Sequence, residues 1–222
     1  MIHNIELSNK HMREVRDLTL SVSSLEEAIK AFPYDGENRV KDPAAENTQL
    51  PPIALVFYDY LYNNDLPPSP KTLINDYLKQ PCFSFLSLEQ VSVSYGPETR
   101  VMSREGLEAR ILRTYPSLLR DLHFYLMCVE SGLFEGVWYS LDDDFKKGVD
   151  IKVLYNRKWF NIALLQNTRR SIFFRDKKRS RHNGSNADVI YVELDQQDSK
   201  KCGDYYLFTK DHVKKVYKSI SR

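Results

Sequence analysis

The sequence predicts an α+β fold in which a mostly helical N-terminal region, residues 1–100, precedes an α/β region, residues 103–222. In the first hundred positions, apolar residues recur at helical spacing between prolines. After Gly132 they gather instead in short β-type runs. The 222 residues are 42% apolar and 12% aromatic, which suits one large or two small domains and excludes a disordered or low-complexity chain.

The N-terminal region is expected to form short helices that begin at capping residues and end near prolines. Two overlapping capping-box patterns start a helix over 23–30. Ser69 and Pro70 suit the N-cap and first position of a helix that reaches about Gln80. The expected elements are helices over 23–30, 52–63 and 70–80 and β-structure within 83–95.

A long helix is expected to begin near Ser103 and to end at Ser131-Gly132. Pro116 either kinks this helix or starts a second one. The elements expected after it are β runs over 134–140, 149–155 and 159–165, a helical segment over 168–181, strands over 189–194 and 205–209, and a helix over 210–220. From residue 103 onward the order is therefore α-β-β-β-α-β-β-α.

The net charge of +2 conceals two halves of opposite sign. Residues 1–100 carry 9 Lys and Arg against 14 Asp and Glu, whereas residues 101–222 carry 23 against 16. A phosphate-binding surface is therefore expected in the second half of the chain.

Several classes of protein are excluded by what the sequence lacks. The three cysteines form no CxxC pair, which argues against a disulfide framework or a zinc cluster. The phosphate-loop, dinucleotide-binding and serine-hydrolase motifs are absent. No apolar run is long enough to span a bilayer and the N-terminus lacks a signal-peptide core, so we expect a cytoplasmic protein with no membrane partner.

One group of polar residues stands at the start and end of the expected strands. Asp150 begins the second β run, and Gln166 ends the third, with Thr168 two positions later. Because positions i and i+2 of a strand face the same way, Gln166 and Thr168 are expected to project together beside Asp150. Asp121 lies upstream, on the long helix.

This order and spacing resembles the PD-(D/E)xK nuclease superfamily, which has the restriction-endonuclease-like fold. The resemblance covers residues 103–222 and implies an α-β-β-β-α-β core with a mixed sheet. It matches Asp121 to the family's helical acid, Asp150 to the motif Asp and Gln166 to the Glu/Gln position. Thr168 stands where the family has lysine, and Lys177 of the next segment is the basic residue expected to replace it.

The resemblance implies metal-assisted hydrolysis of a phosphodiester bond. The catalytic residues are then Asp150, Gln166, Asp121 and Lys177, and the ligands of Mg²⁺ or Mn²⁺ are Asp121, Asp150 and Gln166. Plainer roles remain open: Asp150 as a strand-entry residue, Gln166 as a buried amide and Asp121 in a surface ion pair. Asp142, Asp143 and Asp144 are expected in a solvated loop rather than around a metal.

A cluster of basic residues follows the third β run. Seven of the thirteen residues over 169–181 are Lys or Arg, with one acid among them. Their expected use is phosphate binding with release of counterions, although a solvated helix face is the alternative. Together with Lys177, the residues assigned to nucleic-acid binding are Arg169, Arg170, Arg175, Lys178 and Arg181.

Three hypotheses of function follow. The first is a restriction-like, Mg²⁺-dependent DNA endonuclease. The second is a catalytically inactive protein of the same fold that binds DNA or RNA, or acts in assembly. The third is an adaptor whose apolar helix over 52–63 is an interface. In each, the acidic region 1–100 would serve specificity, dimerisation or a protein partner.

Overall fold

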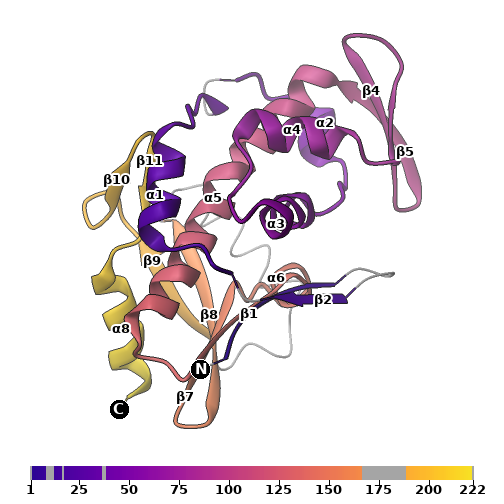
Figure 1. The fold of residues 1–222 in the computed structure, drawn as a ribbon. Coiled ribbons are helices and arrows are strands. Elements are labelled where there is room, and N and C mark those ends of the chain that lie inside the picture. The colour runs from indigo at the N-terminus through magenta and orange to yellow at the C-terminus, as the bar shows by residue number, and fades with distance from the viewer. Residues whose placement is uncertain (1, 9–12, 17, 37–38, 167–188, 222) are drawn as a thin grey trace. The chain divides into compact units, whose positions relative to one another are not determined.

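The structure is a computed structural model, and it describes residues 2–8, 13–16, 18–36, 39–166 and 189–221 (Figure 1). The chain forms two compact units. The sheet unit comprises Met1–Glu27, Arg120–Cys202 and Tyr206–Arg222, and the helical unit comprises Ala28–Leu119 and Gly203–Tyr205. The predicted α+β class is confirmed, including a mixed sheet.

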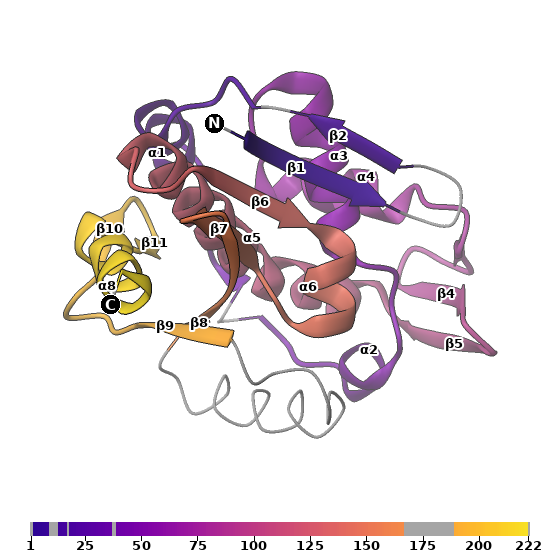
Figure 2. The same ribbon diagram turned by 90° about the horizontal axis from the view of Figure 1, so that it is seen from below.

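Six strands of the sheet unit form one sheet in the order β2-β1-β6-β7-β8-β9 (Figures 1 and 2). They are β1 Ile2–Ser8, β2 Arg13–Arg16, β6 Gly136–Ser140, β7 Ile151–Tyr155, β8 Lys158–Gln166 and β9 Val189–Leu194. β6, β7 and β8 form an antiparallel meander, whereas β1 pairs parallel to β6 and β9 pairs parallel to β8. The three β runs expected between 134 and 165 and the strand over 189–194 are therefore confirmed.

The N-terminal strands correct one expectation. Residues 1–100 are not mostly helical throughout, since β1 and β2 form an antiparallel pair at the edge of the six-stranded sheet. β1 is held in the sheet by pairing with β6, which is about 130 residues away in the sequence. A strand that depends on so distant a partner cannot be predicted from its neighbouring residues. The two compact units accordingly follow a different division from the regions 1–100 and 103–222.

Among the described residues after position 100, three helices contribute to the sheet unit. They are α5 Arg104–Ser131, which supplies residues to both units, α6 Leu141–Lys147 and α8 Lys210–Ile220. Pro116 lies inside an uninterrupted α5, and Gly132 follows its end with φ of 64°, as a helix stop requires. α8 has the predicted bounds and begins at Thr209, whose hydroxyl and backbone N–H pair with His212 in a capping box.

The alternation of side chains gives the six-stranded sheet two different faces. We call the first the apolar face; its fully buried members are Val137, Ile151, Val153 and Ile162. α8 packs against this face, where Tyr217 meets Tyr155 edge to face at 5.4 Å. We call the second the mixed face; its members include Trp138, Lys152, Leu154, Trp159 and Asn161.

The helical unit contains most of the short helices that the sequence predicts. They are α1 Val22–Lys30, shared with the sheet unit, α2 Pro43–Asn47, α3 Ile53–Asn64 and α4 Pro70–Leu78. Ser69 caps α4 as predicted, accepting a hydrogen bond from the Thr72 N–H at 3.1 Å. α1 begins earlier than predicted, because Ser21 supplies the cap and accepts from the Ser24 N–H at 3.1 Å.

Two smaller sheets complete the described chain. An antiparallel sheet in the helical unit consists of β3 Phe83–Phe85, β4 Gln90–Tyr95 and β5 Glu98–Ser103, in the β-prone region that the sequence indicated. A ribbon consists of β10 Lys200–Cys202 and β11 Tyr205–Leu207. α3, proposed as an adaptor interface, has its large apolar residues inside the helical unit, with Phe57, Tyr58 and Leu61 almost fully buried.

Candidate nucleic-acid interface

The residues predicted to form a catalytic site come from three elements of the sheet unit. Asp121 lies on α5 and is half-buried, Asp150 directly precedes β7 and is buried, and Gln166 ends β8 and is half-buried. Thr168, which stands in place of the motif lysine, lies outside the described residues. The catalytic candidate Lys177 and the nucleic-acid-binding candidates also lie outside them: Arg169, Arg170, Arg175, Lys178 and Arg181.

Asp150 holds the entrance of β7 against β8. Its backbone N–H donates to the Ile162 carbonyl at 3.0 Å, and its Oδ2 accepts from the Leu164 N–H at 2.6 Å. The carboxylate thus takes the place of a carbonyl in the strand ladder, as Asp does at turns and strand ends. This contact lies two residues before Gln166, and the projection of Gln166 and Thr168 beside Asp150 stays a prediction.

Gln166 has a position in the sheet that its sequence motif did not reveal. Alternation along β8 places it on the same face as Leu164 and Ile162, and Ile162 is fully buried opposite Ile151 on the apolar face. Its partner on β9 is Leu194, which is also buried. Gln166 therefore continues a row of core residues.

The acidic run 142–144 corrects a second expectation, because it is not a loop. It forms the first turn of α6, where negative side chains interact favourably with the helix dipole. Asp143 is buried and forms ion pairs with Lys147 at 2.6 Å and with Lys152 of β7. Asp144 Oδ2 accepts from the Tyr139 hydroxyl at 3.2 Å. The ion pair between Asp143 and Lys152 of β7 joins α6 to the sheet.

The ion pairs of Asp143 determine its protonation. Burial by itself raises the pKa of this carboxyl, but hydrogen bonds and charges from Lys147 and Lys152 outweigh burial and hold the pKa below its usual value. Asp143 is therefore a carboxylate at neutral pH, with its charge balanced by lysines of the chain.

We next asked whether these acidic residues suit a divalent metal ion. Mg²⁺ and Mn²⁺ require several oxygen ligands that are not already engaged. Asp150 Oδ2 accepts a backbone hydrogen bond, and Asp143 is neutralised by two ammonium groups. Within the described ranges, no three His, Cys, Asp or Glu side chains are placed to hold a metal ion. Asp143 thus fits a metal centre poorly, and we derive no step through one; Asp121, Asp150 and Gln166 as ligands stay a prediction.

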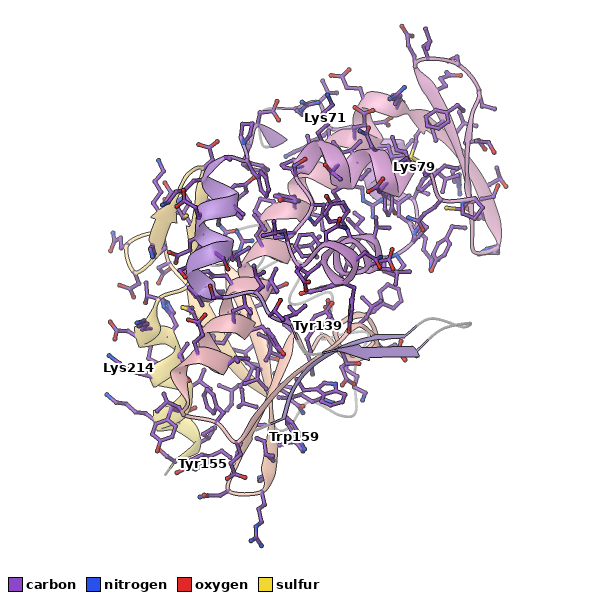
Figure 3. The ribbon with its side chains drawn as sticks, viewed as in Figure 1. Lys71, Lys79, Tyr139, Tyr155, Trp159 and Lys214 are labelled. Atoms are coloured by element: carbon purple, nitrogen blue, oxygen red, sulfur yellow. The ribbon has the colours of Figure 1, made fainter. Side chains whose placement is uncertain are left out.

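The mixed face carries residues that sequence reasoning missed. Trp138 and Trp159 are the two tryptophans of the chain, and their rings meet edge to face with centroids 6.5 Å apart. Trp159 nevertheless leaves 40% of its surface exposed, near the hairpin end of β7 and β8 that also carries Tyr155 (Figure 3). In the sequence, Trp159 and Asn161 alternate with Phe160 and Ile162. This alternation could have indicated that Trp159 and Asn161 form a second row of side chains on the other face of the strand.

The hairpin beside Trp159 has a two-residue turn, formed by Asn156 and Arg157. Tyr155 pairs with Lys158, and both Asn156 and Arg157 have positive φ, 48° and 62°, as a type I′ turn demands. Arg157 and Lys158 are exposed, and Lys158 Nζ lies 5.1 Å from the centre of the Phe160 ring. The Arg157 backbone N–H donates to Glu135 Oε2 at 3.3 Å.

Comparisons with protein-family models, with curated protein sequences and with solved structures each find no match to this chain. Among the described helices, none combines the length and apolar character that crossing a membrane requires.

Proposed function

We propose that this protein binds nucleic acid through its sheet unit and does not hydrolyse it by a metal-dependent route. The proposal takes up the inactive form of the restriction-endonuclease-like hypothesis. Support for binding comes from the excess of Lys and Arg after residue 100 and from their concentration over 169–181, directly after β8.

The observation that carries the choice against hydrolysis is the way Asp150 is used. Its Oδ2 completes the backbone pairing between β7 and β8 at 2.6 Å, while Lys152, two residues later, pairs with Asp143. The Asp150 carboxylate, which metal-dependent cleavage would need at a reacting phosphate, is engaged in holding the sheet together. Thr168 in place of the motif lysine points the same way.

Binding is tested by titrating labelled DNA with the whole chain while salt is varied. We expect binding at about 50 mM salt that weakens steeply as salt rises. The variant R169E/R170E/K177E should lose more than about 10-fold in affinity. It should also reduce the slope of log affinity against log salt concentration by about 3, close to one for each phosphate contact removed.

The matched control has the same change of charge at lysines elsewhere. K71E/K79E/K214E alters two lysines of α4 and its end and one of α8, whose positions Figure 3 marks. If this control weakens binding as much as R169E/R170E/K177E, only net charge matters and the assigned segment is refuted. Failure of the wild-type chain to bind DNA or RNA at about 50 mM salt refutes nucleic-acid binding itself.

Metal-dependent hydrolysis is the second candidate, favoured by the proximity of Asp150 to the end of β8. Its test is incubation of supercoiled plasmid with the chain and Mg²⁺ or Mn²⁺, comparing wild type with Asp150→Ala and Asp150→Asn. Nicking that both variants abolish, while they still fold, would establish the endonuclease and overturn our proposal. Nicking that the variants retain would mark a contaminating nuclease.

A further inference from the structure

We propose that the hairpin end of the mixed face is a stacking platform for single-stranded nucleic acid, built on Trp138 and Trp159 with Arg157 beside them. The inference rests on the proposed function and deepens it by naming the form of nucleic acid. It uses residues of β6, β7 and β8, which are separate in sequence from the basic segment 169–181.

The first argument is the exposure of Trp159. Tryptophan is rarely left open on a sheet, because burying its ring contributes more than burying most other side chains. Trp159 lies opposite Leu154, and the perpendicular contact with Trp138 at 6.5 Å defines how its ring stands. An aromatic surface that is both oriented and 40% exposed offers a flat apolar face to a planar ligand.

The second argument is the charge around that ring. Arg157 and Lys158 directly precede Trp159 and are exposed. Within the described residues, the Arg157 guanidinium forms no ion pair, whereas Lys152 on the mixed face is engaged by Asp143. Lys158 belongs to the opposite face of β8, where its Nζ lies over the Phe160 ring. Glu135 binds the Arg157 backbone rather than its guanidinium. An exposed guanidinium beside an aromatic surface matches the phosphates and bases of a nucleic-acid strand.

The third argument is the backbone of Arg157. Its φ of 62° is a left-handed conformation that glycine adopts without penalty and that a long side chain adopts at a loss of stability. A residue kept in an unfavourable conformation is a mark of function when its side chain supplies something glycine lacks. Here that side chain is a guanidinium, which stacks on bases and pairs with phosphate.

These features select single-stranded over double-stranded nucleic acid. In a duplex the base faces are stacked on one another and are not available to an exposed indole. In a single strand each base presents a face, and stacking on an aromatic side chain is tolerant of sequence. The platform therefore predicts a preference for unpaired strands with little base specificity.

The experiment uses the whole chain and its own fluorescence, because both tryptophans lie in the platform. Titration with an oligothymidylate of about 16 nucleotides should quench the indole emission, and the matching duplex should bind more weakly. With a labelled strand, Trp159→Leu should reduce affinity about 5- to 150-fold, the range for loss of one stacked base. Phe85→Leu, which alters an aromatic of similar exposure in the helical unit, should bind as wild type.

Arg157→Gly separates a binding role from a structural one. Glycine suits the turn, so this variant should melt at or above the wild-type temperature and yet bind the strand more weakly. An Arg157→Gly chain that binds as tightly as wild type would contradict the assignment of Arg157.

The remaining outcomes separate the two proposals. Equal binding of strand and duplex that Trp159→Leu does not change would overturn the platform and leave nucleic-acid binding standing. Binding of neither ligand by the wild-type chain would overturn the proposed function as well. Circular dichroism of each variant establishes that it is folded before its affinity is compared.

Discussion

On the apolar face of the six-stranded sheet, Ile151, Val153 and Ile162 are almost completely buried, whereas on the mixed face Trp159 keeps 40% of its surface exposed. These rows belong to the same strands and differ only in the parity of their positions. The apolar row is packed for stability. The mixed row carries tryptophan, lysine and asparagine side chains that packing alone does not require.

The two faces of the sheet also differ in the ion pairs beside them. Behind the apolar face, Glu26 of α1 pairs with buried His123 of α5 at 3.0 Å and with Lys200 of β10 at 2.6 Å. On the mixed face, Asp143 pairs with Lys147 and Lys152, which keep 57% and 27% of their side chains exposed, whereas His123 is 1% exposed. Interactions shielded from water contribute more than exposed ones, so the two faces are expected to respond differently to mutation.

The largest effect is expected in the apolar row. Ile162→Ala should lower the free energy of unfolding by about 2–5 kcal/mol, because it removes a fully buried side chain and leaves a cavity. Its neighbour on the mixed face supplies the control, and Asn161→Ala should change stability by less than about 0.5 kcal/mol. Urea unfolding measures both, and equal effects would abolish the distinction between the faces.

The shielded ion cluster should give the next largest effect. Glu26→Ala removes charge-assisted hydrogen bonds to His123 and Lys200 and should destabilise by about 1.5–3 kcal/mol. Glu89→Ala, which removes an exposed carboxylate of the helical unit, is the control and should remain within about 0.5 kcal/mol of wild type. A Glu26→Ala chain as stable as this control would show that the cluster is dispensable.

A pH dependence should follow from His123. Burial lowers the pKa of this imidazole below 6.5, and its hydrogen bond to the Glu26 carboxylate, which raises the pKa, does not compensate; Lys200 lowers the pKa further and Glu130 raises it. The unfolded chain therefore takes up the proton first, so stability is complete above about pH 6.5 and falls as the pH falls below it.

The expected loss of stability at low pH is smaller than the effect of Glu26→Ala. His123→Gln should make stability depend less steeply on pH. Burial also lowers the pKa of His212, which contributes a decline of the same sign, so His212→Gln is measured alongside. Thermal unfolding between pH 5 and 8 is the measurement. If the stability of both variants falls with pH as steeply as that of the wild type, the histidines are not the cause of the decline.

The smallest effect is expected where Asp143 joins α6 to the mixed face. Asp143→Asn breaks ion pairs with two partly exposed lysines and should destabilise by about 1 kcal/mol or less. Because the pKa of Asp143 is lowered, its contribution is present above an ordinary aspartate pKa and is lost as the pH falls through that region. Asp142→Asn, which affects one exposed pair, is the control.

The candidate site was predictable in part. The spacing placed Asp150 beside the third β run, and the structure joins Asp150 to Leu164 of that run; its proximity to Gln166 and Thr168 stays a prediction. The spacing did not indicate that this carboxylate binds a backbone N–H, or that Asp143 binds Lys152, because both depend on the register of β7 against neighbouring elements. Trp138 and Trp159 were overlooked because their rings meet only when three strands pair.

The sequence by itself determined the elements with strong local signals. Strand β9 and helix α8 have the predicted bounds, Ser69 caps α4, and Gly132 follows the end of α5. Periodicity, capping and the conformational freedom of glycine act within a few residues, so they can be read without a partner.

Only the tertiary structure decided which distant elements pair and what each side chain does there. β1 became a strand through β6, the acidic run 142–144 became a helix clamped to β7, and Trp159 gained an oriented partner in Trp138. The physical reason is common to all three. Strand pairing and ion pairing between distant segments are non-local, so their free energy depends on contacts that no short stretch of sequence contains.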